Sequence, residues 1–310
     1  MKRERILIIK LGSLGDVLIH SGMIRAIVER HPGAEITMMT GAPYVSLLKP
    51  SGWFADFFVD NRLPYCLSEL KRVCRDFLAV RGFDRIYDMQ SSHRTLGIYY
   101  RLVRLLTRQP LNWGRRVASN RFVFRRTGPK LPFAWGRAKT EELTFEPLPA
   151  DISFCRGERK NFDLLPERYV LLIPGCSAGN VDKRWPADRY RALSEHFGAR
   201  GLKSVVLGTS AEAAEIEAVV RGNPHAVDFM NKASLADIAD LARGAVVVVG
   251  NDTGPTHMAR LTGAKTVMLF CERTRRSAGR GANVINLFGQ TTADIPVEQV
   301  VAAVERTQTE

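Results

Sequence analysis

The sequence predicts an α/β protein made of two doubly wound domains, each with a mostly parallel sheet, and three observations support this fold class. Short β-branched runs lack alternating polar residues, as strands covered on both faces do. Segments with helical periodicity separate these runs, which is typical of parallel sheets. The chain has 310 residues, enough for two domains of about 150 residues each.

The first half begins with a strand, a glycine-containing turn and a helix. The strand is expected at residues 6–9, and the helix that follows has an apolar face made of Val17, Ile24, Ile27 and Val28. Further strands are expected near 36–39, 57–59 and 85–89, and a further helix near 67–78. This order predicts an α/β domain.

A cationic, amphipathic helix is expected after the strand near 85–89. Its polar side carries Arg94, Arg101, Arg104 and Arg108, and its apolar side carries Ile98, Leu102 and Leu106. Two interpretations stay open. The helix either packs on the core with a solvated face, or it presents a surface that grips an anionic substrate embedded in a membrane.

The second half alternates regularly between strands and helices. Strands are expected at 169–173, 204–207, 245–249 and 266–270, and helices at 188–200, 211–221, 235–243 and 256–262. Between 108 and 168 this alternation gives way to a passage rich in proline, glycine and arginine. We therefore place the domain boundary near 161–166, which predicts domains at 1–163 and 164–310.

The composition is that of a soluble globular protein, with 45% hydrophobic and 25% charged residues. The five cysteines form no Cys-x-x-Cys pair and the six histidines no His-Glu-x-x-His motif, so we expect reduced thiols and no dedicated metal site. No apolar run approaches the roughly 18 residues that a membrane span needs, and no signal peptide is evident. The protein is therefore expected in the cytoplasm.

The formal net charge of +13 comes mostly from one window. From Arg94 to Lys139 there are twelve lysines or arginines and no aspartate or glutamate. Such a block indicates a solvated, self-repelling surface or a footprint for phosphates in nucleic acid, lipid headgroups or a substrate. No known recognition module is present, so nucleic-acid binding is not expected.

The stretch GNDTGPTHMARLTGA, residues 250–264, joins a buried strand to a helix and carries a carboxylate, hydroxyls and an imidazole. In parallel α/β sheets, ligands bind beyond the carboxyl ends of the strands, where helix N-termini favour anions. Thr253, Gly254 and Thr256 are suited to donate to a diphosphate, and Pro255 suits the first helical turn. The alternative is a plain helix cap by Asp252 or Thr253. An aspartic protease is disfavoured because Asp-Thr-Gly occurs once, in an α/β context.

Two other loops have similar placement. Residues 10–16, Lys-Leu-Gly-Ser-Leu-Gly-Asp, match neither G-x-G-x-x-G nor the Walker A sequence, which argues against dinucleotide or nucleoside-triphosphate chemistry. Their glycines permit close approach of a ligand, and Asp16 is either a helix cap or a carboxylate that faces the ligand. After the strand at 169–173, Lys183 is either a surface lysine or a cation that neutralises a leaving phosphate.

These loops together resemble glycosyltransferase family 9, the heptosyltransferases that build the inner core of bacterial lipopolysaccharide. ILIIKLGSLGDVLIHSGMIRAI is similar to the family's opening strand, loop and helix, and YDMQSSHRT to its Asp-x-Gln-x-x-x-Arg/Lys-Ser/Thr segment. IPGCSAGNVDKRWP and GNDTGPTHMA resemble its two donor-site signatures. The resemblance extends over nearly the whole chain.

The resemblance implies a GT-B fold, in which two Rossmann-like domains face each other across a cleft, with the acceptor on residues 1–163 and the nucleotide-sugar donor on 164–310. It implies an inverting transfer of heptose from ADP-L-glycero-β-D-manno-heptose to Kdo-lipid A or a heptosylated core, without a metal or other cofactor. The implied partners are the donor, an anionic lipopolysaccharide precursor and the cytoplasmic face of the inner membrane, with peripheral association.

The resemblance also implies residue roles. Asp16 matches the catalytic base, which removes the proton of the acceptor hydroxyl and is worth roughly 10² to 10⁴ in rate. The implied donor-binding residues are Ser177, Lys183, Thr209, Glu212, Asp252, Thr253, Gly254, Pro255 and His257. The implied acceptor-binding residues are Gly12, Ser13, Gly15, Asp88, Gln90 and Arg94.

The chain departs from the family pattern at two places. After the strand TVMLF the family usually has Gly-Pro/Ser-Thr-Asp-Pro, whereas this chain has Cys-Glu-Arg-Thr-Arg-Arg at 271–276, and the loop at 175–183 looks longer than is common. Two alternatives therefore stay open: a non-catalytic or accessory protein of the same fold that binds anionic glycolipid, and a family member that uses a different nucleotide-sugar.

Overall fold

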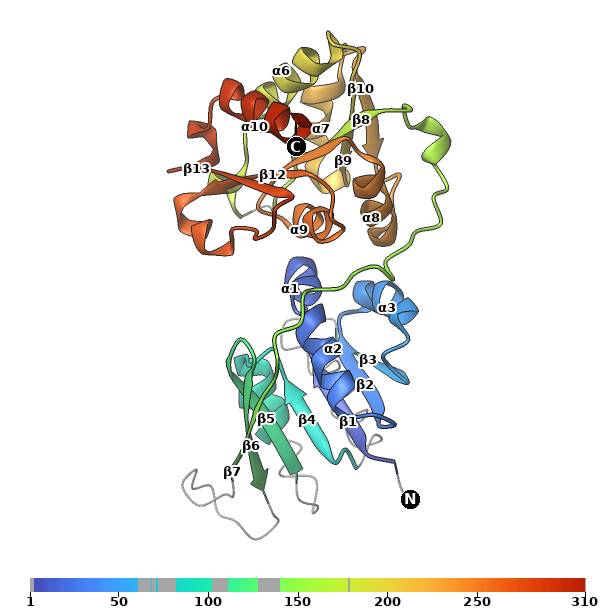
Figure 1. Cartoon of the computed structure of the whole chain (residues 1–310), viewed down its shortest axis with the longest axis vertical. Coiled ribbons are helices and arrows are strands. Elements are labelled where there is room, and N and C mark those ends of the chain that lie inside the picture. The colour runs from blue at the N-terminus through green and yellow to red at the C-terminus, as the bar shows by residue number, and fades with distance from the viewer. Residues whose placement is uncertain are drawn as a thin grey trace. The chain divides into compact units, whose positions relative to one another are not determined.

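The computed structural model describes residues 3–60, 68, 71, 82–101, 111–127, 140–177 and 179–309. Its contacts divide the chain into two compact units, Met1–Asp151 and Ile152–Glu310 (Figure 1). This division lies earlier in the chain than the predicted boundary after residue 163. The reason is that the intervening segment is bonded to the second unit. The Gly157 N–H donates to Asp240 Oδ2 at 2.9 Å, and the Arg159 N–H to Asp237 Oδ1 at 2.8 Å.

The first unit contains a seven-stranded sheet. In sheet order its strands are β3 (Asp56–Val59), β2 (Glu35–Thr40), β1 (Arg5–Ile9), β4 (Arg85–Asp88), β5 (Leu111–Ala118), β6 (Arg121–Thr127) and β7 (Thr140–Thr144). The strands from β3 to β5 run parallel, and β6 and β7 pair antiparallel. The four strands predicted in the first half are confirmed, and the antiparallel edge adds to them.

The antiparallel edge packs on the parallel sheet through aromatic side chains. In β6, Phe122 and Phe124 are buried, whereas Arg121 is exposed. The ring of Tyr87 in β4 meets both phenylalanine rings edge-on, with centroids 5.1 and 4.9 Å apart. The strand thus buries alternate residues, Phe122 and Phe124, and leaves Arg121 exposed, as is typical of an antiparallel strand with one solvated face.

Short helices follow the strands of the first unit. They are α1 (Leu14–Ile19), α2 (Ser21–Arg30), α3 (Ala42–Leu48), the 3-10 turn η1 (Lys49–Ser51) and the π-helical segment η2 (His93–Tyr99). The predicted first helix is thus two helices that meet at His20. The predicted helix near 67–78, apart from residues 68 and 71, and the end of the basic helix with Arg104 and Arg108 lie outside the described residues.

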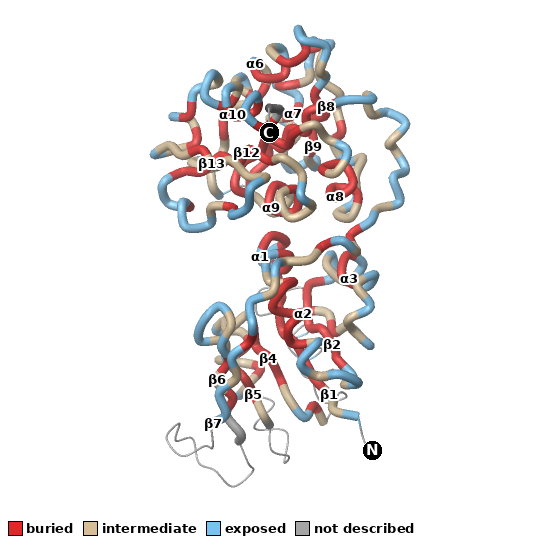
Figure 2. The backbone as a smooth tube through the Cα atoms, in the orientation of Figure 1, coloured by how far each residue is buried: buried red, intermediate tan, exposed pale blue. Residues whose placement is uncertain are grey.

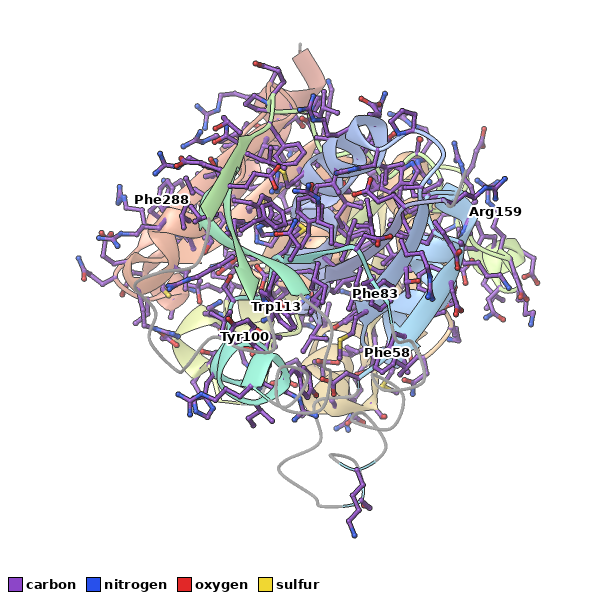
Figure 3. All side chains as sticks on the ribbon, turned by 90° about the horizontal axis from the view of Figure 1, so that it is seen from below. Phe58, Phe83, Tyr100, Trp113, Arg159 and Phe288 are labelled. Atoms are coloured by element: carbon purple, nitrogen blue, oxygen red, sulfur yellow. The ribbon has the colours of Figure 1, made fainter. Side chains whose placement is uncertain are left out.

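The core of the first unit lies between the sheet and these helices. Leu7 and Ile9 of β1 pack in a buried cluster with Phe58 and Phe83. Figure 3 labels these two phenylalanines and also Tyr100 and Trp113. The rings of Tyr100 and Trp113 meet edge-on, with their centroids 5.3 Å apart. The apolar stripe predicted for the basic helix therefore contributes to the core, because Ile98 packs against this cluster.

The second unit contains a six-stranded sheet in which all neighbouring strands are parallel. In sheet order its strands are β10 (Ala226–Met230), β9 (Lys203–Gly208), β8 (Tyr169–Ile173), β11 (Val247–Asn251), β12 (Thr266–Cys271) and β13 (Val284–Gly289). Numbered along the chain, this is the order 3-2-1-4-5-6 of the doubly wound dinucleotide-binding fold. The four predicted strands are confirmed, and β10 and β13 add to them.

Helices cover both faces of this sheet. They are α6 (Ala187–Gly198), α7 (Ala213–Val220), α8 (Leu235–Gly244), α9 (Gly254–Leu261) and α10 (Val297–Thr309). Five 3-10 turns complete the unit: η3 (Phe162–Leu164), η4 (Val181–Lys183), η5 (Ser210–Glu212), η6 (Glu272–Ser277) and η7 (Thr292–Asp294). Helix α6 packs against α7 and α10 in one group, and α8 packs against α9 in another. The strands that lie between these two groups of helices are buried (Figure 2).

The core of the second unit reaches the loop that follows β8. Trp185, in the Lys-Arg-Trp-Pro sequence, is 1% exposed and donates through Nε1 to the Ile295 carbonyl at 2.8 Å. The thiols of Cys155, Cys176 and Cys271 are free and buried, and Cys66 and Cys74 lie outside the described residues. Over the described ranges, no helix has both the length and the apolar character needed to cross a bilayer.

Candidate functional site

Each unit has a topological switch point, and the predicted site residues gather there. In the second unit, β8 and β11 are neighbours in the sheet. After β8 the chain continues to β9 on one side of this pair, and after β11 it continues to β12 on the other side. In doubly wound sheets the loops after such a pair of strands separate and leave a crevice in which ligands bind. The loop after β8 carries Lys183, and the loop after β11 carries Asp252 and Thr253.

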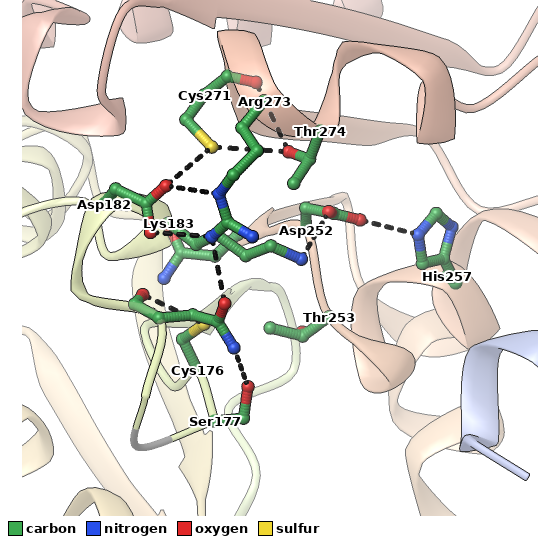
Figure 4. Close-up of polar contacts among 12 residues, drawn as sticks. Cys176, Ser177, Asp182, Lys183, Asp252, Thr253, His257, Cys271, Arg273 and Thr274 are labelled. Carbon is green, nitrogen blue, oxygen red and sulfur yellow. Dashed lines mark hydrogen bonds and ion pairs between the residues drawn. The ribbon is translucent and has the colours of Figure 1, made fainter.

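Four side chains form a continuous polar chain at this switch point, and Figure 4 shows the part from Lys183 to His257. Lys183 Nζ lies 2.8 Å from Asp252 Oδ2, and His257 Nε2 lies 2.9 Å from Asp252 Oδ1. Arg260 Nε donates to His257 Nδ1 at 3.1 Å. Since Nδ1 accepts, Nε2 carries the imidazole proton and donates it to Asp252. The predicted residues Lys183, Asp252 and His257 are thus brought together.

The electrostatics of this chain keep Asp252 ionised. Burial opposes ionisation, but the hydrogen bonds from His257 and Lys183 outweigh it and hold the pKa of Asp252 below its usual range. The Lys183 side chain keeps 18% of its surface exposed, compared with 6% for Asp252. Lys183 is therefore the more accessible member of the pair, and its ammonium group is held by a buried carboxylate.

The N-terminus of α9 adds backbone donors at the same place. Thr253 is the N-cap residue, but its side chain makes no capping hydrogen bond. Its hydroxyl instead lies 3.1 Å from that of Thr256. The first N–H groups of α9 are therefore not capped by a side chain, and the helix dipole favours a negative charge beside them. The alternative of a plain side-chain cap does not describe this turn.

Asn251 joins the two loops, and sequence patterns do not identify it. Its side chain is fully buried at the end of β11. Nδ2 donates to the carbonyl of Pro174 at 2.8 Å, and Oδ1 accepts from the Trp185 N–H and the Tyr190 hydroxyl, both at 3.1 Å. Asn251 thereby holds the loop that carries Lys183 against the loop that carries Asp252.

The other predicted donor residues lie on neighbouring loops of the same sheet edge. Ser177 is exposed and accepts from Asn180 Nδ2 at 2.7 Å. Thr209 and Glu212 form a capping box, in which the Thr209 hydroxyl donates to Glu212 Oε2 at 2.6 Å. The β-carbon that any other residue would add at Gly175 would lie 2.8 Å from Glu212 Cγ, so glycine permits this close packing. The donor roles of Ser177, Thr209 and Glu212 stay predictions.

The first unit has the corresponding arrangement at its own switch point, between β1 and β4. The turn after β1 includes Gly12 at φ +128°, a conformation that favours glycine. Ser13 occupies the N-cap position of α1, and Gly15 and Asp16 follow in its first turn. The Asp16 side chain is 54% exposed, so the carboxylate is neither a helix cap nor turned into the core.

Lys10, His20 and Arg116 lie near Asp16, and the sequence analysis did not identify them as site residues. Lys10 is buried at the end of β1 with Nζ 3.9 Å from Asp16 Oδ2. Burial lowers the pKa of His20 to about 4, and Arg116 and Lys10 act in the same direction. Arg116 in β5 is attracted electrostatically by Asp16. Its buried Nη1 has no hydrogen-bond partner among the described residues. A basic residue at the end of a buried strand was the available signal for Lys10.

The predicted acceptor residues Asp88, Gln90 and Arg94, at and after the end of β4, bond to other residues of the first unit. Gln90 Oε1 accepts from the Leu11 N–H at 3.1 Å and so holds the loop that contains Asp16. Asp88 is fully buried, accepts from the Ser91 N–H at 2.7 Å, and has its pKa raised by burial. Arg94 makes a bidentate pair with buried Asp60, at 2.9 and 2.8 Å. Contact of Asp88, Gln90 or Arg94 with an acceptor stays a prediction.

Comparison with known protein sequences gives the following matches. The family model described as "Glycosyltransferase family 9 (heptosyltransferase)" matches residues 89–294. Lipopolysaccharide heptosyltransferase 1 of Salmonella typhimurium is 21% identical over 292 residues, which cover 86% of this chain and 88% of that protein. Lipooligosaccharide heptosyltransferase 2 of Haemophilus influenzae is 27% identical over 134 residues, and this match spans only 41% of this chain and 38% of the relative.

Solved structures with the same architecture cover nearly the whole chain. A family 9 glycosyltransferase from Veillonella parvula has a TM-score of 0.72 at 16% identity, covering 99% of this chain and 97% of that one. Escherichia coli heptosyltransferase WaaC, with ADP-2-deoxy-2-fluoro heptose, has a TM-score of 0.71 at 15% identity, covering 97% and 99%. The iron-containing glycosyltransferase TibC of enterotoxigenic E. coli has a TM-score of 0.56 at 13% identity, covering 99% and 76%. The predicted class, two Rossmann-like α/β units of the GT-B type, is confirmed.

Proposed function

Because the chain belongs to glycosyltransferase family 9 and is therefore a glycosyltransferase, we propose that it transfers a heptose from ADP-L-glycero-β-D-manno-heptose to the inner core of lipopolysaccharide, with inversion at the anomeric carbon. The observation that carries this proposal is the Lys183–Asp252–His257 chain beside the N-terminus of α9. It gathers the groups that a leaving diphosphate requires.

In the proposed reaction Asp16 is the general base. Its carboxylate takes the proton of an acceptor hydroxyl as the hydroxyl oxygen attacks C1 of the heptose. The C1–O bond to the β-phosphate breaks, and ADP leaves with the bonding electron pair. This role suits Asp16 because its carboxylate is more than half exposed on the first turn of α1.

The proposed donor site stabilises the negative charge that develops on the diphosphate. Lys183 supplies an ammonium group, and the uncapped turn at Thr253, Gly254 and Thr256 supplies backbone N–H groups and the positive end of the α9 dipole. Asp252 and His257 hold Lys183 in place. Since these groups supply positive potential, we expect transfer without added metal, and addition of EDTA to the assay tests this expectation.

The proposed acceptor is an anionic lipopolysaccharide precursor, such as Kdo-lipid A or a heptosylated core. Lys10 and Arg116 place positive charge around Asp16, and the window from Arg94 to Lys139 extends this charge along the sequence. Sugar phosphates and carboxylates would be attracted to such a surface. We propose that the protein works in the cytoplasm at the inner membrane, where it meets this lipid-linked acceptor as a peripheral protein.

A second candidate is transfer from another nucleotide-sugar, and the sequence at 271–276 favours it. That segment replaces the usual family sequence with Cys-Glu-Arg-Thr-Arg-Arg and forms η6, which follows β12 in the donor unit. A change there alters the loop that lies next to the Lys183 turn. The sugar and base of the donor therefore need to be tested separately from the transfer itself.

The experiment incubates the protein with ADP-heptose, UDP-sugars or GDP-sugars and a truncated core acceptor, and it identifies the nucleotide released. Release of ADP that depends on the acceptor, with a heptosylated product in the mass spectrum, is the expected result. Release of UDP or GDP instead would show a different donor. Donor or glycolipid binding without release of any nucleotide would favour the non-catalytic alternative.

A further inference from the structure

The loop after β12 is bonded to the turn that carries Lys183. Arg273, in η6, makes a two-pronged contact with the Asp182 carboxylate (Figure 4). Nε lies 2.9 Å from Oδ2, and Nη2 lies 2.8 Å from Oδ1. Nη2 also donates to Asn180 Oδ1 at 2.9 Å. A single guanidinium group therefore holds two residues of the η4 turn.

Other contacts tie the same turn to the sheet edge. The Thr292 hydroxyl donates to the Asp182 carbonyl at 3.2 Å. The Cys271 thiol, fully buried at the end of β12, lies 3.5 Å from Asp182 Oδ2. Asp182 is thus the point at which η4, β12, η6 and η7 meet, and Lys183 is the next residue in the chain.

The charge of Asp182 bears on the proposed donor site. The hydrogen bonds from Arg273 lower the pKa of Asp182 to about 2, so this carboxylate is ionised at neutral pH. Because Asp182 directly precedes Lys183 in the chain, its negative charge, if left unpaired, would repel a diphosphate bound at Lys183. A bidentate arginine satisfies both carboxylate oxygens and offsets their charge.

We propose that Arg273 is a positioning residue of the donor site, which acts through Asp182 to keep the Lys183 turn in place and the Asp182 charge away from the diphosphate. The proposal rests on the proposed function. It also gives the departure at 271–276 a role. The arginine supplied there compensates for an aspartate that precedes the phosphate-binding lysine.

The test is a double-mutant cycle on ADP binding, measured by calorimetry with the full chain. The Kd for ADP is compared between the wild type and Arg273→Ala, and again between Asp182→Asn and the Arg273→Ala/Asp182→Asn double variant. We expect Arg273→Ala to raise the Kd by about fivefold to tenfold when Asp182 is present. In the Asp182→Asn background its effect is expected to fall to about twofold or less.

Two further variants sharpen the comparison. Arg273→Lys keeps a positive charge but cannot contact both carboxylate oxygens of Asp182 with two separate nitrogens, so it is expected to recover only part of the lost affinity. Arg275→Ala is the matched control, because Arg275 belongs to the same turn but pairs with Glu272 at 3.0 Å and lies over the Phe288 ring. It is expected to leave the Kd for ADP unchanged.

The possible results separate the inference from the function on which it rests. If Arg273→Ala weakens ADP binding by the same factor or more in both backgrounds, Arg273 contacts the nucleotide directly and the proposal is overturned. If it lowers the Tm without changing the Kd, its role is only structural and the proposal also fails. Should the wild type bind UDP or GDP instead of ADP, the donor assignment fails and the same cycle is run with that nucleotide. If it binds no diphosphate, inorganic pyrophosphate included, both proposals fail.

Discussion

Lys183 and Asp252 are 69 residues apart in the chain, and their Nζ and Oδ2 atoms lie 2.8 Å apart. The two residues meet because β8 and β11 are neighbours in the sheet although β9 and β10 separate them in sequence. Asp252 is buried and Lys183 is partly exposed. The pair therefore places a partly exposed lysine, held by a buried carboxylate, at the switch point of the second unit.

Replacing Lys183 by alanine is expected to weaken ADP binding by about tenfold to a hundredfold, since a hydrogen bond to a charged group is worth about 1.5 to 3 kcal/mol. The Kd is measured by calorimetry. Lys203→Ala is the matched control, because Lys203 is exposed at the start of β9, at the opposite end of the strands from the switch point. Equal Kd values for Lys183→Ala and the wild type would remove Lys183 from the donor site.

Replacing Asp16 by asparagine is expected to lower the transfer rate by about 10² to 10⁴ while leaving ADP binding unchanged. The side chain keeps its size, and the carboxylate it loses is exposed, so the fold is expected to tolerate the change. Single-turnover kinetics and calorimetry on the same preparation separate the two effects. Transfer at the wild-type rate would show that another group removes the acceptor proton.

The regular part of the fold is predictable because β-branched runs and helical periodicity repeat along the chain. The arginine-rich hairpin of β5 and β6 is harder to recognise, because its exposed face carries residues such as Arg121 that look like loop or surface sequence. The buried Phe122 and Phe124 were the available signal. A single helix was expected where α1 and α2 meet at His20, because both present apolar residues at compatible spacing.

The site was predictable only where several functional groups lie close together in sequence. Asp252, Thr253 and His257 fall within six residues, so their gathering could be anticipated. The bonds from Asn251 to the loop after β8, and from Arg273 to Asp182, depend on which strands are neighbours. A motif match also does not reveal the surroundings of a residue. Asp88 is buried and Arg94 is paired with Asp60, and neither fact could be predicted from the motif.

Replacing Asn251 by alanine is expected to reduce the free energy of unfolding of the second unit by about 2 to 4 kcal/mol, because buried groups of Pro174, Trp185 and Tyr190 lose a partner. Urea denaturation measures the change. Ser204→Ala is the matched control, since the buried Ser204 hydroxyl in β9 has no hydrogen-bond partner among the described residues. It is expected to change stability by less than about 1 kcal/mol. Equal losses for the two variants would contradict the role of Asn251.

Asp240 makes the stability of the second unit depend on pH. Burial opposes its ionisation, but hydrogen bonds from Arg159, Gly157 and Arg156 dominate and lower its pKa from 3.8 to about 2. A lowered folded pKa stabilises the folded state above the unfolded pKa, and this stabilisation is lost as the pH falls through the folded pKa. The contribution is about 2 kcal/mol at neutral pH.

Asp240→Asn is therefore expected to lower the Tm at pH 7, and the difference from the wild type is expected to shrink as the pH is lowered from about 4 toward 2. Thermal unfolding at several pH values measures this difference. Glu158→Gln is the control, because Glu158 lies in the same segment but is 74% exposed and pairs with Lys160. A Tm difference that stays constant down to pH 2 would show that the charge of Asp240 contributes nothing to stability.

Arg116 in the first unit has a guanidinium group that the described residues satisfy only in part. Its Nη1 is buried without a hydrogen-bond partner among the described residues, and burial lowers its pKa despite attraction to Asp16. An anionic acceptor group beside Asp16 would supply the missing partner. Arg116→Gln is therefore expected to raise the KM for the acceptor by about tenfold and to leave the Kd for ADP unchanged, since one charge-assisted contact is worth about 1.4 kcal/mol.

The comparison that decides this prediction uses two acceptors and one control. With an acceptor that lacks its phosphate groups, the difference between Arg116→Gln and the wild type is expected to shrink if Arg116 binds phosphate, and to persist if it binds a sugar carboxylate. Arg121→Ala is the control, because Arg121 belongs to the same hairpin but is exposed and pairs with Glu142 at 3.0 Å. An unchanged acceptor KM in Arg116→Gln would mean that its guanidinium serves the packing of β5 instead, and a lower Tm for that variant would then be its only effect.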